Sequence, residues 1–277
     1  MNIQVGKKIL DARSVGVNVE GVDLLADISL DIQPGEIVAL VGPNGSGKST
    51  FLRAVTGEQK TCSGEISFNY KDLSGWNRRD LARNLAVLPQ QSVLNFPFTG
   101  REVVSLARTP HDTGNQIDTE IVDQVLDYLD ANYLADRLYP RLSGGEQQRI
   151  QLARVLAQIW DKADQPRLLL LDEPSSYFDL AHQQMLIELV YQLAKRNIAV
   201  LIVLHDINMA MACSDRIAVL SCGRLKAFGK TDEVITPELL KSVFSVEARF
   251  VIDPETGERF MTMPGSSRRS LAAGETE

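Results

Sequence analysis

Long apolar runs are missing from this sequence of 277 residues. The longest wholly apolar stretch, Ile198 to Leu204, is only seven residues long, whereas a membrane-spanning helix needs about 20. The first residues, MNIQVGKKILDARS, also lack the apolar segment and small-residue cleavage site of a secretion signal. We therefore expect a chain that neither crosses a bilayer nor is secreted, with enough apolar residues (44%) for a globular core.

Cysteine is also scarce. Cys62, Cys213 and Cys222 are scattered and show no C-x-x-C spacing. This pattern argues against a disulfide framework and against a zinc site, and it favours reduced thiols.

An excess of basic residues is absent as well. The sequence has 29 Lys and Arg against 36 Asp and Glu, which gives a net charge of −7. Binding to a phosphate backbone needs basic side chains concentrated on one face. Nucleic acid is therefore not expected as the main partner.

What is present is an alternation of short apolar runs with helical patterns. The runs Ile37–Val41, Leu168–Leu171 and Ile198–Leu204 are apolar at successive positions, and Ile217–Leu220 is a further expected strand. Strands of this kind are usually covered on both faces, as in parallel sheets with helices packed on either side. The sequence thus predicts an α/β fold.

Two other hydropathy patterns interrupt this alternation. Residues 16–30 and 64–70 nearly alternate apolar and polar side chains, which predicts antiparallel β-strands at the sheet edge. Residues 91–160 carry apolar side chains at helical spacing and predict an inserted helical subdomain. We expect one domain over residues 1–264 and a flexible polar tail over 265–277.

A glycine-rich segment, GPNGSGKST, directly follows the first buried strand and precedes a helix. It matches G-x-x-x-x-G-K-[ST], in which backbone amides surround phosphate oxygens, the lysine reaches the outer phosphates and the serine hydroxyl binds Mg²⁺. A glycine-rich turn without a ligand is the alternative. The predicted ATP-binding residues are Gly42, Pro43, Asn44, Gly45, Ser46, Gly47, Lys48, Ser49 and Thr50.

Two acidic residues, Asp172 and Glu173, stand where another apolar strand ends. Open α/β sheets bind ligands at this end of their strands. Asp172 is suited to hold Mg²⁺, and Glu173 to orient or deprotonate a water. A solvated turn would have the same composition, but together with the glycine-rich loop the pair predicts a nucleoside triphosphatase.

A third motif, LSGGEQQR from Leu142 to Arg149, opens a helix. Ser143 and Glu146 have the spacing of a capping box, so a purely structural helix cap is one interpretation. The same arrangement leaves a hydroxyl, two glycine amides and the positive end of a helix facing outward. The segment is therefore a candidate anion site.

LSGGEQQR resembles the signature motif of the ATP-binding cassette (ABC) family, and other landmarks follow in the family's order over residues 10–250. Gln90 matches the Q-loop glutamine, Asp179 the D-loop aspartate and His205 the switch histidine, although the family more often has Leu where Phe178 stands. The resemblance implies a P-loop nucleotide-binding domain that hydrolyses ATP with Mg²⁺.

The resemblance also assigns roles to these residues. Glu173, His205 and Gln90 are the expected catalytic residues, and Ser49, Gln90 and Asp172 the expected Mg²⁺ ligands. Ser143, Gly144, Gly145 and Gln147 are expected to contact the ATP held by another copy. Because the chain has one set of motifs, a head-to-tail homodimer is implied.

Further resemblances concern transport. FPFT, EVVSLARTPH and FVIDPETGERF resemble segments of hemin-import ATPases, which implies a peripheral subunit on the cytoplasmic face of the inner membrane, two permease partners and, indirectly, an extracytoplasmic hemin-binding protein. Siderophore or cobalamin import is the alternative cargo. Phe96, Pro97 and Phe98 are either core residues or a docking groove for the permease. His111 is expected to be solvated, and His182 to lie at the surface.

One family feature is missing. No aromatic residue precedes Phe51, whereas the family usually stacks adenine on one there; Val17 or Val19 occupies that neighbourhood. A cassette protein acting on nucleic acid or ribosomes would normally carry two cassettes or a long coiled coil. A purely regulatory cassette would lack a carboxylate like that of Glu173. A transporter ATPase is therefore the favoured interpretation.

Overall fold

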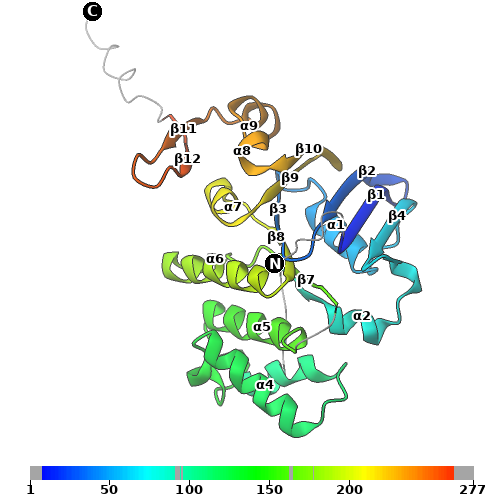
Figure 1. The fold of residues 1–277 in the computed structure, drawn as a ribbon, viewed down its shortest axis with the longest axis vertical. Coiled ribbons are helices and arrows are strands. Elements are labelled where there is room, and N and C mark those ends of the chain that lie inside the picture. The colour runs from blue at the N-terminus through cyan, green and yellow to red at the C-terminus, as the bar shows by residue number, and fades with distance from the viewer. Residues whose placement is uncertain (1–7, 91–93, 95, 162–164, 177, 265–277) are drawn as a thin grey trace, which may run out of the picture.

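A six-stranded sheet forms the centre of the computed structural model, which describes residues 8–90, 94, 96–161, 165–176 and 178–264. Its strand order is β10-β9-β3-β8-β7-β6, and all neighbours are parallel except β10 and β9 (Figure 1). The predicted parallel α/β core is thus confirmed. The strands are β3 (Ile37–Val41), β6 (Leu85–Leu88), β7 (Arg167–Asp172), β8 (Ile198–Val203), β9 (Arg216–Ser221) and β10 (Arg224–Lys230).

The two faces of this sheet contribute to different hydrophobic clusters. Ile37, Ala39 and Val41 of β3 pack with α5 (Gly144–Gln158), α6 (Leu180–Lys195) and α7 (Ile207–Cys213). Val38 and Leu40 face the opposite side and pack with α1 (Lys48–Val55) and a second sheet. Because both faces are buried, strand residues are apolar at every position rather than at alternate ones.

The second sheet has four strands in the order β2-β1-β4-β5, all antiparallel. The predicted antiparallel strands are confirmed, and they form a sheet of their own that covers one face of the central sheet. Irregular pairing within β1 explains why the alternation in the sequence is imperfect. The strands are β1 (Leu10–Val19), β2 (Val22–Ile32), β4 (Ser63–Phe68) and β5 (Lys71–Asp72).

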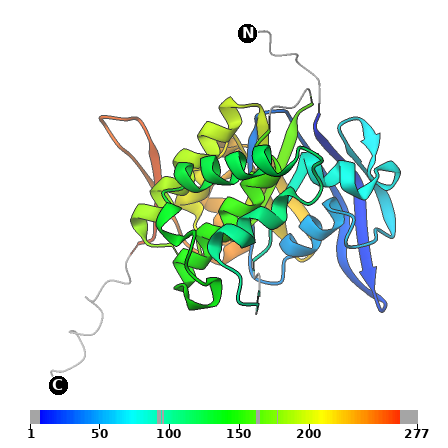
Figure 2. The same cartoon turned by 90° about the horizontal axis from the view of Figure 1, so that it is seen from below.

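Helices fill most of residues 100–158 and gather on one side of the molecule (Figure 2). They are α3 (Gly100–Ser105), α4 (Asn115–Tyr128) and α5. The buried side chains of α4 recur at helical spacing, as the sequence pattern predicts. The division into one domain over residues 1–264 stays a prediction, and residues 265–277 lie outside the described part of the chain.

The remaining elements surround this core. The hairpin of β11 (Arg249–Ile252) and β12 (Arg259–Thr262) projects from the body in Figure 1. The side chain of Asn208 in α7 holds it, because its Nδ2 donates to the Met261 carbonyl oxygen and its Oδ1 accepts from the Met261 amide. Within the described ranges, none of the helices combines the length and the apolar content that a membrane span requires. The α-helices among the remaining elements are α2 (Arg78–Asn84), α8 (Thr231–Val234) and α9 (Pro237–Phe244).

One histidine is less exposed than the sequence predicted. His111 is nearly buried, with Nε2 2.9 Å from the Gln158 carbonyl oxygen and Nδ1 3.4 Å from an Asp161 carboxylate oxygen, and burial lowers its pKa. The prediction of a solvated His111 is wrong because its loop folds back onto the end of helix α5, a contact that local composition does not reveal. His182, in the first turn of α6, keeps 31% of its side chain exposed, as expected for a surface residue, and contacts Arg149 and Asp179.

Candidate nucleotide-binding site

The glycine-rich loop joins β3 to α1, and its geometry leaves the start of the helix free. Gly47 is the N-cap of α1 with φ 102°, and no side chain caps the helix there. A Cβ at Gly47 would lie 2.6 Å from Leu25 Cδ2, so both the backbone conformation and the space require glycine. The uncapped amides can therefore donate to phosphate oxygens.

Lys48 is held by the loop itself. Its Nζ donates to the Gly42 carbonyl oxygen at 2.8 Å and to the Pro43 carbonyl oxygen at 3.1 Å, and the residue is only 6% exposed. Burial lowers the pKa of Lys48, while the charges of Glu173 and Asp172 oppose that shift. A cation shielded from water in this way interacts strongly with an incoming phosphate.

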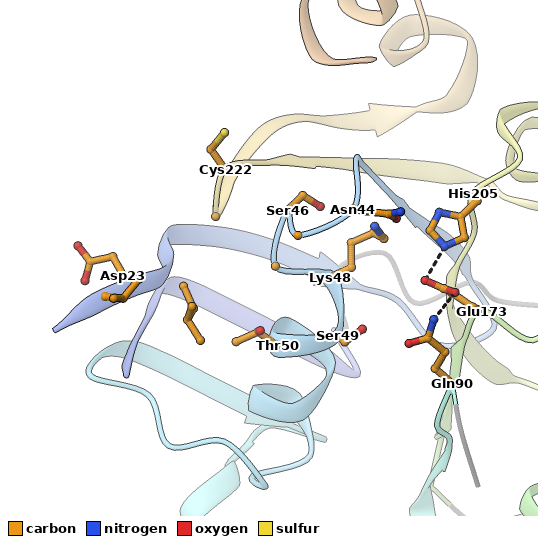
Figure 3. A pocket seen from close by; sticks show the side chains of 15 residues that line it. Asp23, Asn44, Ser46, Lys48, Ser49, Thr50, Gln90, Glu173, His205 and Cys222 are labelled. Atoms are coloured by element: carbon orange, nitrogen blue, oxygen red, sulfur yellow. Dashed lines mark hydrogen bonds and ion pairs between the residues drawn. The ribbon is translucent and has the colours of Figure 1, made fainter. Parts of the chain in front are cut away.

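A cavity of about 770 Å³ extends over this loop. Figure 3 shows the loop in the middle, Gln90, Glu173 and His205 at one end, and Asp23 and Cys222 at the other. The cavity thus has a charged end for phosphates and a second end for the rest of a ligand. Its remaining lining residues are Val22, Leu24, Asn44, Gly45, Ser46, Gly47, Lys48, Ser49, Thr50 and Gly223.

The charged end is assembled from the carboxyl ends of three neighbouring strands. Gln90 follows β6, Glu173 follows β7 and His205 follows β8, and these strands are adjacent and parallel. Residues far apart in the sequence meet because parallel strands end at the same edge of a sheet. The structure therefore brings together the three residues that the sequence predicted as catalytic.

Glu173 is the centre of this group. Its Oε2 accepts a hydrogen bond from Gln90 Nε2 at 2.6 Å, and its Oε1 lies 2.5 Å from His205 Nε2 (Figure 3). Its backbone has φ 52°, in the sparsely populated left-handed region. The two contacts fix the carboxylate at the cavity wall, where it can orient a water and accept its proton.

Asp172 and Ser49 fit a divalent cation. Asp172 is buried, its Oδ1 has no hydrogen-bond partner among the described residues, and burial raises its pKa, with the nearby Ser49 hydroxyl opposing the shift. Ser49, Gln90 and Asp172 line one further cavity together. Carboxylate, hydroxyl and amide oxygens are the ligands that Mg²⁺ prefers. The residues present thus suit Mg²⁺.

The signature segment lies elsewhere. Ser143 is exposed, and it caps α5 through the predicted capping box with Glu146, whose carboxylate accepts from the Ser143 amide at 2.7 Å. Gln147 donates to the carbonyl oxygens of Tyr139 and Leu142. Neither Ser143 nor Gly144, Gly145 or Gln147 lines the cavity over the glycine-rich loop.

Asp179 begins helix α6 and is also turned outward. Its side chain is 68% exposed, and its Oδ1 accepts from the His182 amide at 2.9 Å. That amide and the His182 ring hold the pKa of Asp179 below its usual value. Asp179 thus places a negative charge at the surface of the chain.

The residues at the far end of the cavity were missed by the sequence analysis. Val17 is fully buried in the core and Val19 lies outside the cavity, and the expectation that base recognition rests on apolar contact in their neighbourhood stays a prediction. Val22 and Leu24 of the following strand line the cavity instead. No motif marks Val22 and Leu24. They reach the cavity only because β2 pairs with β1 and lies close to the turn after β9.

Comparison with known proteins defines the class. The profile of the family described as ABC transporter matches residues 25–176, which is more than half of the chain. The chain therefore belongs to the ABC transporter family. A solved ABC transporter of the metal-chelate type, in an inward-facing conformation, superposes with a TM-score of 0.77 at 28% identity, covering 93% of this chain and 97% of that one.

More similar relatives carry a specific name. The hemin import ATP-binding protein HmuV of Gloeobacter violaceus is 43% identical over 270 residues, covering 96% of this chain and 98% of the relative. HmuV of Pseudomonas fluorescens strain Pf0-1 is 45% identical over 234 residues, covering 84% of this chain and 91% of the relative. The likeness thus extends over nearly the whole length of these proteins.

Proposed function

We propose that this chain is the ATP-hydrolysing subunit of an importer for hemin. The observation that carries the proposal is the position of Glu173 between Gln90 and His205 beside the glycine-rich loop. Glu173 accepts a proton from the attacking water, and His205 contacts the γ-phosphate. When bound, Mg²⁺ neutralises phosphate charge, with Ser49, Gln90 and Asp172 as its ligands.

The site is completed by a second copy of the chain. Lys48 and the glycine-rich loop bind the triphosphate from one side, and the signature residues Ser143, Gly144, Gly145 and Gln147 of the other copy bind it from the opposite side. The exposure of Ser143 and its absence from the cavity of its own chain support this arrangement. ATP joins the two copies, and hydrolysis allows them to part.

Two permease subunits convert this movement into transport. Phe96 is 66% exposed, whereas Phe98 packs against the core, with the two ring centroids 6.0 Å apart. Phe96 is thus available to a partner, and the Phe98 ring, which packs against the core, lies next to it. We therefore infer a peripheral subunit at the cytoplasmic face of the inner membrane, with a hemin-binding protein acting on the far side.

The cargo assignment rests on the names of the relatives. The decisive experiment measures ATP hydrolysis by the complex reconstituted with its permease, with hemin, a ferric siderophore or cobalamin presented on the matching binding protein. Stimulation by hemin alone is expected. Stimulation by one of the other two cargoes instead would overturn the hemin assignment while leaving the ATPase intact.

The catalytic role is tested separately by Glu173→Gln. The amide keeps the size of the side chain but cannot accept a proton, so turnover should fall by roughly 100-fold or more, while ATP binding persists. The variant should then accumulate as an ATP-bound dimer on size-exclusion chromatography. Wild-type turnover would remove Glu173 from this role.

A further inference from the structure

Arg149 is a buried cation without a carboxylate partner among the described residues. It belongs to α5, the helix that Ser143 opens, and is only 8% exposed. Its Nη1 donates to the Asp130 carbonyl oxygen at 3.2 Å, its Cζ lies 5.7 Å from the Tyr133 ring centroid, and its Nε has no partner. A guanidinium in this setting depends on the few acceptors it has.

The strongest of those acceptors is an imidazole. Arg149 Nη2 lies 2.6 Å from His182 Nε2, and His182 Nδ1 lies 2.6 Å from Asp179 Oδ1. Since arginine can only donate and a carboxylate can only accept, both contacts are satisfied when His182 is neutral with its proton on Nδ1. The Phe178 ring, with its centroid 5.7 Å from that of His182, packs beside the imidazole.

This chain of contacts connects the signature helix with the segment around Asp179. Arg149 stands in the second turn of the helix that begins after Ser143, and Asp179 is the N-cap of α6, six residues after Glu173. The His182 amide holds Asp179 Oδ1 as well. The signature helix and the segment that follows the catalytic carboxylate are therefore linked through the His182 side chain, in addition to the hydrogen bond from Gln148 Nε2 of α5 to the Pro174 carbonyl oxygen at 3.3 Å.

We propose that His182 is a positioning residue that holds the Asp179 segment at a fixed place relative to the signature helix, so that both meet the second copy of the chain together. The inference rests on the proposed ATP-bound homodimer. It assigns His182 no contact with nucleotide. Without the imidazole link, Arg149 loses one of its few acceptors and the Asp179 segment loses a contact with the signature helix. The position of Asp179 is then less well fixed when the copies join, which weakens dimer formation.

Two substitutions separate the two contacts. In His182→Gln the side-chain oxygen can reach the Nε2 position and accept from Arg149. In His182→Asn the shorter amide can reach only the Nδ1 position, so it donates to Asp179 and leaves Arg149 without its acceptor. The backbone amide that caps Asp179 is retained in both variants.

The experiment places both variants in the Glu173→Gln background and measures the ATP concentration needed for half-maximal dimer formation by size-exclusion chromatography with light scattering. We expect His182→Asn to raise that concentration about tenfold, with ATP binding to the monomer unchanged. His182→Gln, which keeps the acceptor for Arg149, should dimerise like its parent. His111→Gln is the control and should also dimerise like the parent.

The outcomes distinguish a failure of the proposed homodimer from a failure of the role proposed for His182. If Glu173→Gln alone forms no ATP-dependent dimer, the proposed homodimer fails. If it dimerises and His182→Asn in the same background dimerises equally well, the positioning role of His182 is refuted. Thermal unfolding of each variant checks that a weaker dimer does not reflect an unfolded chain, and a His182→Asn protein that is folded but binds ATP poorly as a monomer would also contradict the proposal.

Discussion

Lys48 Nζ donates to the carbonyl oxygen of Gly42 at 2.8 Å, so the lysine is held in place by the backbone of its own glycine-rich loop. A phosphate oxygen can take over this hydrogen bond without a large movement of the side chain. The cost of ordering a long, flexible cation is thereby met during folding and not during nucleotide binding.

Replacing Lys48 by alanine should weaken ATP binding by roughly 10- to 100-fold, because a charge-assisted hydrogen bond in a shielded site is lost. Isothermal titration calorimetry with Mg-ATP measures the change. Lys60→Ala, at an exposed position, is the control and should bind like the parent. An unchanged Kd for Lys48→Ala would contradict the assignment of the loop.

The aromatic-free end of the cavity can be tested by adding an aromatic side chain. Leu24→Trp should tighten ATP binding up to about tenfold, because a base stacked on an indole gains about 1 kcal/mol or more. Val19→Trp is the matched control, since Val19 (38% exposed) and Leu24 (37% exposed) differ mainly in lining the cavity.

Nucleotide-dependent quenching of the new tryptophan fluorescence gives a second measurement for the same pair. Quenching in Leu24→Trp alone is expected. If Val19→Trp responded and Leu24→Trp did not, the base would lie where the sequence first suggested.

The start of helix α5 should respond to pH. The Ser143 amide, with help from Arg137, holds the pKa of Glu146 below its usual value. A carboxyl group whose pKa is lowered by folding stabilises the protein above its unfolded pKa, and the contribution disappears as the pH falls through the folded value.

Glu146→Ala should therefore cost about 1 kcal/mol at pH 7, the usual worth of a helix cap, and much less at pH values where the wild-type carboxylate is protonated. Urea unfolding at several pH values measures this difference. Glu120→Ala, on the exposed side of α4, serves as control. A penalty for Glu146→Ala that is constant across the acid range would show that the charge is not involved.

Substitutions of Phe96 and Phe98 should separate an effect on permease docking from an effect on folding. Phe96→Asp is expected to leave ATP binding and thermal stability nearly unchanged but to reduce recovery of the chain with its permease. Phe98→Asp should lower stability itself, because that ring packs against the core. Copurification with the tagged permease measures assembly, and normal assembly of Phe96→Asp would exclude Phe96 from the interface.

The sequence predicted those parts of the site that lie within short segments. The glycine-rich loop, the acidic pair and the capped signature helix are each specified by neighbours in the chain, so their residue types and spacing reveal them. The order of strands then explains why Gln90, Glu173 and His205 meet. These features of the structure follow from local rules together with the geometry of a parallel sheet.

The remaining features depend on contacts between distant segments. Val22 and Leu24 reach the cavity only because β2 lies beside the turn after β9, where the backbone carbonyl of Gly223 accepts from the Ala26 amide at 2.8 Å. His111 and His182 are covered by α5, which is 30 or more residues away in the sequence. Such contacts leave no pattern in the composition of the segments that make them.

The central claim is that each ATP is held by Lys48 of one copy and Ser143 of the other, and complementation of two variants in ATP hydrolysis tests it most directly. Ser143→Asp keeps a good helix N-cap but places a negative charge against the partner's triphosphate. The account predicts that Lys48→Ala and Ser143→Asp are each inactive alone, and that mixing them restores hydrolysis because one site of the mixed dimer is intact. Hydrolysis at the wild-type rate by Ser143→Asp alone would contradict the account.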